Sequence, residues 1–117
     1  MNNQYKHLQT TYDSNVLATL VHETDRMTSL EISKVTGREH KNVMRDIRNI
    51  LDQGVAELNF ELGYYMDKNN QQRPMYTLTK KGCLILASGY DAVLREKIIN
   101  RWEELELKER QQQEPID

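Results

Sequence analysis

The strongest constraint on the fold lies in residues 28–51, whose pattern predicts two short helices joined by a tight turn. Thr28 and Glu31 have the spacing of a capping box, in which the first side chain accepts a hydrogen bond at the start of a helix. Gly37 follows, and glycine readily takes the left-handed conformation that ends a helix. A second helical pattern begins almost at once. The stretch therefore predicts a helix-turn-helix.

The second helix, expected at about residues 39–51, is apolar on one side and basic on the other. At about 100° per residue, an arc of roughly 120° would face the core, and it holds Val43, Met44, Ile47, Ile50 and Leu51. The opposite arc holds Arg38, Lys41, Asn42, Arg45, Arg48 and Asn49. Arginine and lysine can contact phosphates or guanine, and asparagine can pair with adenine. The helix thus has the side chains that the DNA major groove requires.

An ordinary amphipathic helix with a solvated polar face is the alternative explanation, because most surface helices carry lysine and arginine. The outward arc is unusual in that it contains no acidic residue, since Glu39 and Asp46 fall at its flank. This absence favours a contact surface. His40 projects into the apolar arc near the start of the helix, so we expect it to be packed or to cap the helix rather than to read a base.

Composition predicts a single domain that is no polybasic nucleic-acid coat, because 117 residues carry a net charge of −2. The charges are unevenly distributed. Residues 31–51 hold five basic and three acidic residues, and residues 67–81 hold four basic and one acidic residue. Residues 52–66 and 91–117 are each net −3. This polarity could orient the molecule on a polyanion.

Several function classes lack their usual signals. The single cysteine, Cys83, excludes an internal disulfide framework and a multi-cysteine zinc site, and its apolar neighbours predict a buried thiol. No phosphate-binding glycine loop or nucleophile elbow is present, so we expect no enzyme activity, cofactor or metal. The sequence lacks a signal peptide and an apolar run of the ~18 residues that a membrane span requires. A cytoplasmic location fits these observations.

Two strands are expected after the helix pair. Residues 58–66 alternate, which predicts a half-buried strand with Leu58, Phe60, Leu62, Tyr64 and Met66 on one face. A polar loop, residues 67–73, leads to a second strand over residues 74–79 that begins with Pro74. The two strands predict a β-hairpin with Lys68 and Arg73 near its tip. The hairpin could serve as a wing that contacts the DNA backbone or as a plain ribbon that covers the core.

The remaining elements complete the domain, expected over residues 15–110. Residues 1–14 would be a flexible segment, and residues 16–21 a strand that returns through Met27 and Thr28. Thr79 would cap a helix that ends at Ser88 and Gly89, and Asp91 would cap a last helix reaching about residue 110. That helix carries a stripe that would pack on the core or form a dimer seam with Ile99 and Leu107: Leu94, Ile98, Trp102 and Leu105. Residues 111–117 would be a frayed tail.

The order of these elements predicts an α+β fold: a winged helix-turn-helix-like domain with a β-hairpin wing and a long C-terminal helix. Three segments also resemble a known family. The first segment lies in the helix pair and comprises Thr28-Ser29-Leu30-Glu31-Ile32 and Thr36-Gly37-Arg38-Glu39-His40-Lys41-Asn42-Val43-Met44-Arg45-Asp46-Ile47. The second is Phe60-Glu61-Leu62 in the first strand of the hairpin. The third comprises Pro74-Met75-Tyr76-Thr77-Leu78-Thr79 and Lys81-Gly82. Together they closely resemble the Rha family of phage and prophage regulatory proteins.

The resemblance, which spans about residues 15–105, implies a winged-helix-like regulator of temperate phages that acts on transcription or development, with residues 38–49 as the reading element. We expect double-stranded DNA as the partner and a homodimer through the C-terminal helix. The outward arc of the second helix, with Lys68 and Arg73, would make the contacts. A different class of function is an antirepressor-like module that binds a repressor or host nucleoid protein without DNA. A pure oligomerisation unit is a third.

Overall fold

The computed structural model describes residues 26–113, so the predictions for residues 1–25 and 114–117 lie outside the described part of the chain. Over the described residues the fold is α+β, with four α-helices and a three-stranded antiparallel sheet. The elements are β1 (Arg26–Thr28), α3 (Ser29–Thr36), α4 (His40–Asp52), the short 3₁₀-helix η2 (Glu57–Asn59), β2 (Phe60–Met66), β3 (Gln72–Thr79), α5 (Lys80–Ser88) and α6 (Ala92–Gln113).

The helix pair α3–α4 forms as its local signals predict. The Thr28 side chain accepts a hydrogen bond from the amide of Glu31 at 3.1 Å, and so caps α3. Gly37 ends α3 in the left-handed conformation with φ of 79°, which glycine adopts without steric cost. The predicted apolar arc of α4 faces inward, with Val43, Met44 and Ile47 buried.

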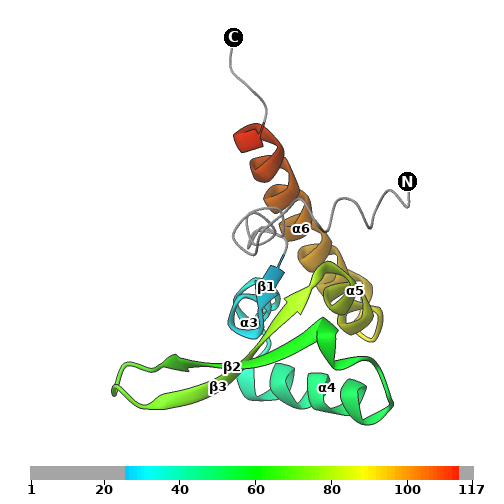
Figure 1. Ribbon diagram of the computed structural model, residues 1–117. Helices are drawn as coiled ribbons and strands as arrows, with labels where there is room; N and C mark the ends of the chain where they lie inside the picture. Colours follow the sequence, from blue (N-terminus) through cyan, green and yellow to red (C-terminus); the bar gives the residue numbers. More distant parts are fainter. Residues whose placement is uncertain (1–25, 114–117) are drawn as a thin grey trace, which may run out of the picture.

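The sheet has the strand order β1–β3–β2, and β2 and β3 form the predicted hairpin. Phe60 pairs with Leu78 near its base and Met66 with Gln72 near its tip. Because β1 pairs with β3 only from Thr77 to Thr79, the outer half of the hairpin is two-stranded. That half projects beyond the first turn of α4 (Figure 1). β3 starts two residues before Pro74, where the edge of β3 opposite β2 is not paired with β1.

One prediction for the hairpin is wrong. The apolar face of the strand, which was expected to be buried, is buried only at Phe60, which is 2% exposed. Leu62, Tyr64 and Met66 are 53–57% exposed. Leu58 lies in η2 rather than in the strand and is 74% exposed. The physical reason is that alternation of side chains shows which residues share a face of a strand, but not whether another element packs on that face. Beyond Phe60 the strand extends away from the body.

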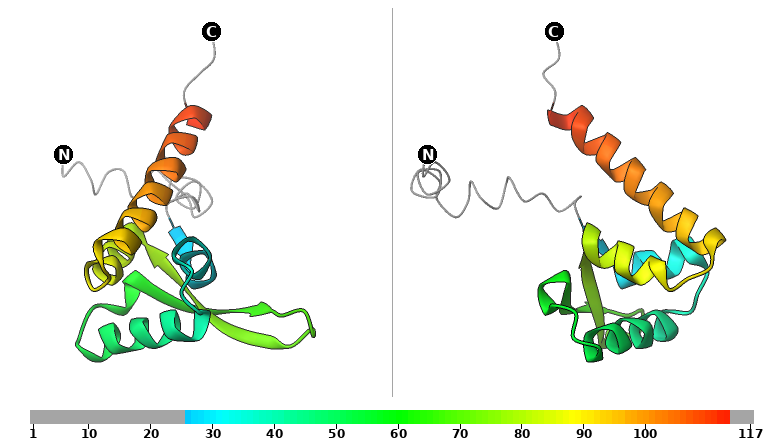
Figure 2. Two further views of the ribbon diagram at one scale, coloured as in Figure 1. Left: turned by 180° about the vertical axis from the view of Figure 1, so that it is seen from behind. Right: turned by 90° about the vertical axis from the view of Figure 1, so that its right-hand side faces the viewer.

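The helices α5 and α6 complete the core. Thr79 caps α5 and Asp91 caps α6, as predicted, although Gly89 ends α5 without a left-handed conformation. The stripe on α6 packs on the domain's own core, with Ile98, Trp102 and Leu105 buried. α6 continues through residues 111–113, which the sequence assigned to the frayed tail. Figure 2 shows α6 leading away from α4, in a different direction from the hairpin.

Candidate nucleic-acid interface

The outward face of α4 presents basic and amide side chains to solvent. Lys41, Arg45, Arg48 and Asn49 are exposed and Asn42 is half-buried. These side chains share one orientation because Val43 and Ile47, on the opposite side of α4, are buried and so fix the rotation of the helix. The last residue of α4, Asp52, is an exposed acid on the outward side at the end of the helix. The basic surface therefore belongs to the first three turns.

Two contacts organise the side chains on this face. The Arg45 guanidinium donates a hydrogen bond to the amide oxygen of Asn42 at 2.8 Å, so these two polar groups are presented as a pair. Lys41 lies 3.7 Å from the carboxylate of Glu39, and both side chains are largely exposed. An exposed ion pair of this length contributes little and leaves the ammonium group available to a stronger anion.

A hollow of about 300 Å³ lies between α4 and the hairpin. It brings Lys41 and Arg48 of the helix together with Arg73 of β3, which lies 25 residues after Arg48 in the sequence. Its other lining residues are His40, Met44, Tyr65 and Pro74. Converging cations beside a concave surface are suited to an anionic group such as a phosphate. The sequence predicted the three cations as contacts but did not place them around one hollow.

The tip of the hairpin is held by Asp67. Its carboxylate accepts hydrogen bonds from the amides of Asn69 and Gln71, and it pairs with the Arg73 guanidinium at 2.8 Å. The bond from Arg73 lowers the pKa of Asp67 below its ordinary value of 3.8. Asn70 takes a left-handed conformation with φ of 63°, which asparagine tolerates in turns. Lys68 is exposed at the tip, while Arg73 is already engaged by an acid.

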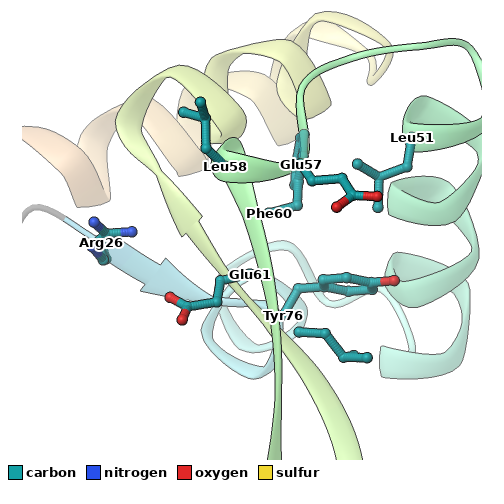
Figure 3. Close-up of a pocket in the computed structure, with 8 residues that line it drawn as sticks. Arg26, Leu51, Glu57, Leu58, Phe60, Glu61 and Tyr76 are labelled. Atoms are coloured by element: carbon teal, nitrogen blue, oxygen red, sulfur yellow. The ribbon is translucent and has the colours of Figure 1, made fainter.

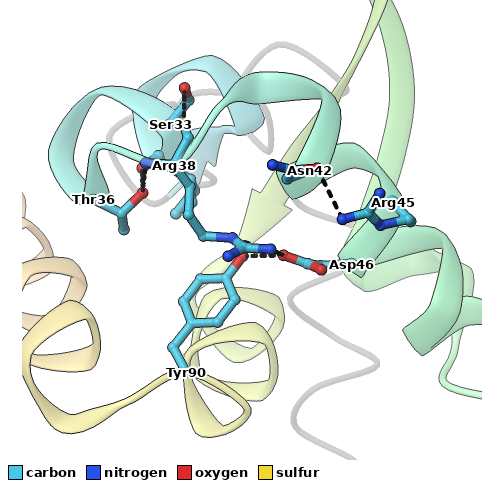
Figure 4. Close-up of polar contacts among 8 residues, drawn as sticks. Ser33, Thr36, Arg38, Asn42, Arg45, Asp46 and Tyr90 are labelled. Atoms are coloured by element: carbon cyan, nitrogen blue, oxygen red, sulfur yellow. Dashed lines mark hydrogen bonds and ion pairs between the residues drawn. The ribbon is translucent and has the colours of Figure 1, made fainter.

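Arg38 differs from the other predicted contact residues. Its guanidinium lies 2.9 Å from the carboxylate of Asp46 and its central carbon lies 5.1 Å from the ring centre of Tyr90 (Figure 4). The Tyr90 hydroxyl donates to the same carboxylate at 2.7 Å. The structure therefore places the Arg38 head group in an intramolecular cluster, whereas Asn42 and Arg45 point elsewhere. Sequence reasoning missed Tyr90 because 44 residues separate it from Asp46.

His40 is packed, as predicted. Its Nε2 lies 2.8 Å from the hydroxyl of Ser29 at the start of α3, and its ring meets the ring of Tyr65 edge to face at 5.9 Å. Burial, with the positive charge of Arg48 nearby, lowers the pKa of His40 below its ordinary value of 6.5. A neutral imidazole thus ties the first turn of α4 to α3 and to the hairpin. The sequence could have placed Tyr65 on the opposite face of β2 from Tyr64, because successive side chains of a strand point to opposite faces.

A second hollow, of about 660 Å³, contains none of the predicted contact residues. It lies beside β2, with Leu51 of α4 on one side and Arg26 of β1 on the other (Figure 3). Its lining mixes two exposed apolar side chains, Leu58 and Leu62, and two buried aromatic ones, Phe60 and Tyr76, with the acids Glu57 and Glu61. Acidic groups would repel a phosphate, so this hollow has the chemistry of a protein contact rather than of a nucleic-acid contact.

Residues 26–113 contain no cluster of three or more histidine, cysteine or acidic side chains that could hold a metal ion. No helix in this part of the chain is long and apolar enough to cross a membrane. Cys83 is fully buried, and burial raises the pKa of its thiol to about 12, so it has the properties of a core residue.

Comparison with known proteins identifies a family. The family model for phage regulatory protein Rha matches residues 27–107, which is more than half of the chain. A region of 66 residues is 41% identical to an uncharacterized protein of Haemophilus influenzae (strain ATCC 51907 / DSM 11121 / KW20 / Rd). The match covers 53% of this chain and 38% of that relative, so the chain spans about two fifths of the relative's length. No solved structure matches the chain.

Proposed function

The chain belongs to the family of phage regulatory protein Rha, and from that premise we propose that it binds double-stranded DNA through α4 and the hairpin to control transcription. In this proposal the fold acts as a winged helix-turn-helix. The helix α3 supports α4, α4 enters the major groove, and the β2–β3 hairpin is the wing beside it.

The observation that carries the proposal is the joint basic surface of α4 and the hairpin. Lys41 and Arg48 border the same hollow as Arg73, so a phosphate between the helix and the wing would meet all three. In the free chain of the structure, Arg73 pairs with Asp67. The Arg73 side chain is 52% exposed, so its guanidinium remains accessible to a phosphate that would replace the carboxylate.

The remaining residues have separate roles in this scheme. Arg45 and Asn42 lie paired on the outward face and would read base edges, since arginine suits guanine and asparagine suits adenine. Asn49 extends that face by one turn, and Lys68 would add a phosphate contact from the tip of the wing. The predicted place of Arg38 beside the phosphates competes with its contacts to Asp46 and Tyr90.

The test compares Arg45→Ala with Arg110→Ala, an exposed arginine near the far end of α6, in binding to DNA duplexes of random sequence. If Arg45 reads a base, its loss weakens binding to the selected sequence by about 1–3 kcal/mol, and the Arg110 variant binds as the wild type does. Lys68→Ala should instead weaken binding to all sequences alike and flatten the salt dependence by about one unit. Unchanged binding by Arg45→Ala/Arg48→Ala would remove α4 from the proposal.

A second candidate function rests on the exposed apolar residues of β2 and the mixed hollow beside it. Leu62, Tyr64 and Met66 form an apolar surface that a protein partner could cover. In this alternative the chain is an antirepressor-like module that binds a repressor or host nucleoid protein and makes no DNA contact. Retention of such a protein with no retention on DNA at low salt would favour it, and loss of that retention in Tyr64→Ser would map it to β2.

We also propose a homodimer through α6, because Val93, Ile99 and Leu107 are exposed although the stripe beside them packs inward. A dimer would pair two copies of α4 with two half-sites on DNA. Sedimentation equilibrium at high protein concentration tests this directly. A monomer at all concentrations would contradict it, as well as the weaker idea of a pure oligomerisation unit.

A further inference from the structure

We propose that Arg38, Asp46 and Tyr90 form a positioning cluster that sets the orientation of α4 against the α5–α6 turn, and that Arg38 serves DNA binding through this cluster rather than by touching a phosphate. This inference rests on the proposed function, since the orientation of α4 matters for binding only if α4 contacts DNA. It assigns Tyr90 and Asp46, which lie outside the predicted contact set, to the same activity.

The cluster is compact and its three members satisfy one another. The Asp46 carboxylate receives the Arg38 Nε at 3.1 Å, an Arg38 terminal nitrogen at 2.9 Å and the Tyr90 hydroxyl at 2.7 Å. The Arg38 guanidinium also lies over the Tyr90 ring, an arrangement in which a cation is attracted to an aromatic face. The Arg38 and Asp46 side chains are 32% and 22% exposed, so the pair is only partly screened by water.

Each member comes from a different part of the fold (Figure 4). Arg38 lies in the turn between α3 and α4, where its carbonyl accepts from the Ser33 hydroxyl at 2.6 Å and its amide donates to the Thr36 hydroxyl at 3.2 Å. Asp46 is in the second turn of α4. Tyr90 lies between α5 and α6, and its carbonyl accepts from the Arg95 guanidinium at 2.8 Å. The cluster therefore joins α4 to the elements behind it.

The chemistry requires these residue types. A guanidinium is planar, so its edge can pair with a carboxylate while its face lies on a ring, and the ammonium group of lysine has no such planar face. Burial, together with the Asp46 carboxylate, raises the pKa of Tyr90 above its ordinary value of 10.0. The hydroxyl thus keeps its proton and remains a donor to Asp46 throughout the physiological range. Arg38, in turn, has its charge largely offset by Asp46, which leaves little attraction for a phosphate.

The two roles of Arg38 predict different salt dependences. Each phosphate contact contributes about 0.9 to the slope of log affinity against log salt. A residue that only positions α4 changes the affinity at every salt concentration but not the slope. Disturbing a coupled network of this kind changes affinity by about 2- to 30-fold. The slope and the affinity together therefore distinguish contact from positioning.

The experiment measures DNA affinity across a salt series for Tyr90→Phe, Arg38→Ala and the double variant, at a temperature where circular dichroism shows each to be folded. Lys68→Ala serves as the phosphate-contact reference. We expect both single variants to lose affinity with an unchanged slope. We expect the double variant to lose less affinity than the product of the two single fold-losses, because the two residues act in one interaction. A slope reduced by about 0.9 in Arg38→Ala, or full affinity in folded Tyr90→Phe, would overturn the proposal.

A readout without DNA separates failure of this inference from failure of the proposed function. In urea unfolding, the double-mutant cycle between Arg38 and Tyr90 measures their interaction directly. Amide chemical shifts of α4 in Tyr90→Phe then report whether the helix changes its orientation. If the wild type does not bind DNA, the proposed function fails together with the affinity arm of this test. Additive unfolding energies with unshifted α4 amides would show that the cluster itself positions nothing.

Discussion

Gly82 is where the structure makes its sharpest quantitative prediction. Gly82 lies inside α5, where replacing glycine by alanine ordinarily stabilises a helix by about 1 kcal/mol. Here a Cβ atom would lie 2.4 Å from the carbonyl oxygen of Asn59 and 3.3 Å from the ring of Phe60. The first distance is far inside van der Waals contact, so either α5 or η2 must shift.

The magnitude follows from how firmly Asn59 is held. Its side-chain oxygen accepts from the Thr79 hydroxyl at 3.1 Å, its side-chain amide reaches the carbonyl of Ala56 at 3.4 Å, and the residue is only 4% exposed. Because the clashing atom is backbone in a buried segment, the cost falls at the upper end of overpacking penalties, about 3 kcal/mol. Subtracting the helix-propensity gain of about 1 kcal/mol leaves Gly82→Ala less stable by about 2 kcal/mol.

Urea denaturation followed by the fluorescence of the buried Trp102 measures this change. Gly63→Ala is the matched control, since a Cβ atom there meets nothing within 4 Å and the strand gains from the substitution by about 0.5 kcal/mol. The expected loss corresponds to a lower Tm by about 8–16 °C for a domain of this size. A Gly82→Ala variant as stable as the wild type would refute the close approach of α5 and η2.

Three further predictions concern the core and the ionisable groups. Ile47→Ala should lower the free energy of unfolding by about 2–5 kcal/mol, because the side chain is fully buried, whereas Leu84→Ala on the exposed side of α5 should change it by less than about 0.5 kcal/mol in urea titrations. Cys83 should resist thiol reagents in the native state at neutral pH and react on unfolding, because burial raises its pKa to about 12; fast labelling of native protein would contradict this. His40 has a lowered pKa in the fold, so its stabilising contribution is present above pH 6.5 and is lost as the pH falls towards its folded pKa; His40→Gln should remove that part of the pH dependence of unfolding.

The helix pair could be predicted because its signals are local. Capping by Thr28 and the left-handed Gly37 each involve residues within one turn of the chain. The rotation of α4 followed from the spacing of its apolar residues alone. The resemblance to Rha is confirmed by the family match. The DNA contacts of α4 and the wing stay a proposal.

The exposure of the hairpin could not be predicted because it depends on whether other elements of the fold pack on its faces. Leu62, Tyr64 and Met66 alternate as a buried face would, but no described helix covers them where the hairpin leaves the body. Long-range polar contacts were missed for a similar reason. The helical pattern assigns Arg38 to the outward arc with the other cations, but it cannot show that Tyr90, from the α5–α6 turn, lies beside Arg38 in the folded chain. Only the folded chain brings these residues together.

DNA binding by α4 and the hairpin is tested by measuring how the unmodified chain binds pooled random-sequence duplexes over a salt series, with sequencing of the retained fraction. If both elements bind DNA, log affinity falls linearly with log salt and the retained duplexes share an enriched motif. The slope then gives the number of phosphates contacted. No retention even at low salt would contradict DNA binding and would leave the basic face of α4 as a surface for a protein partner.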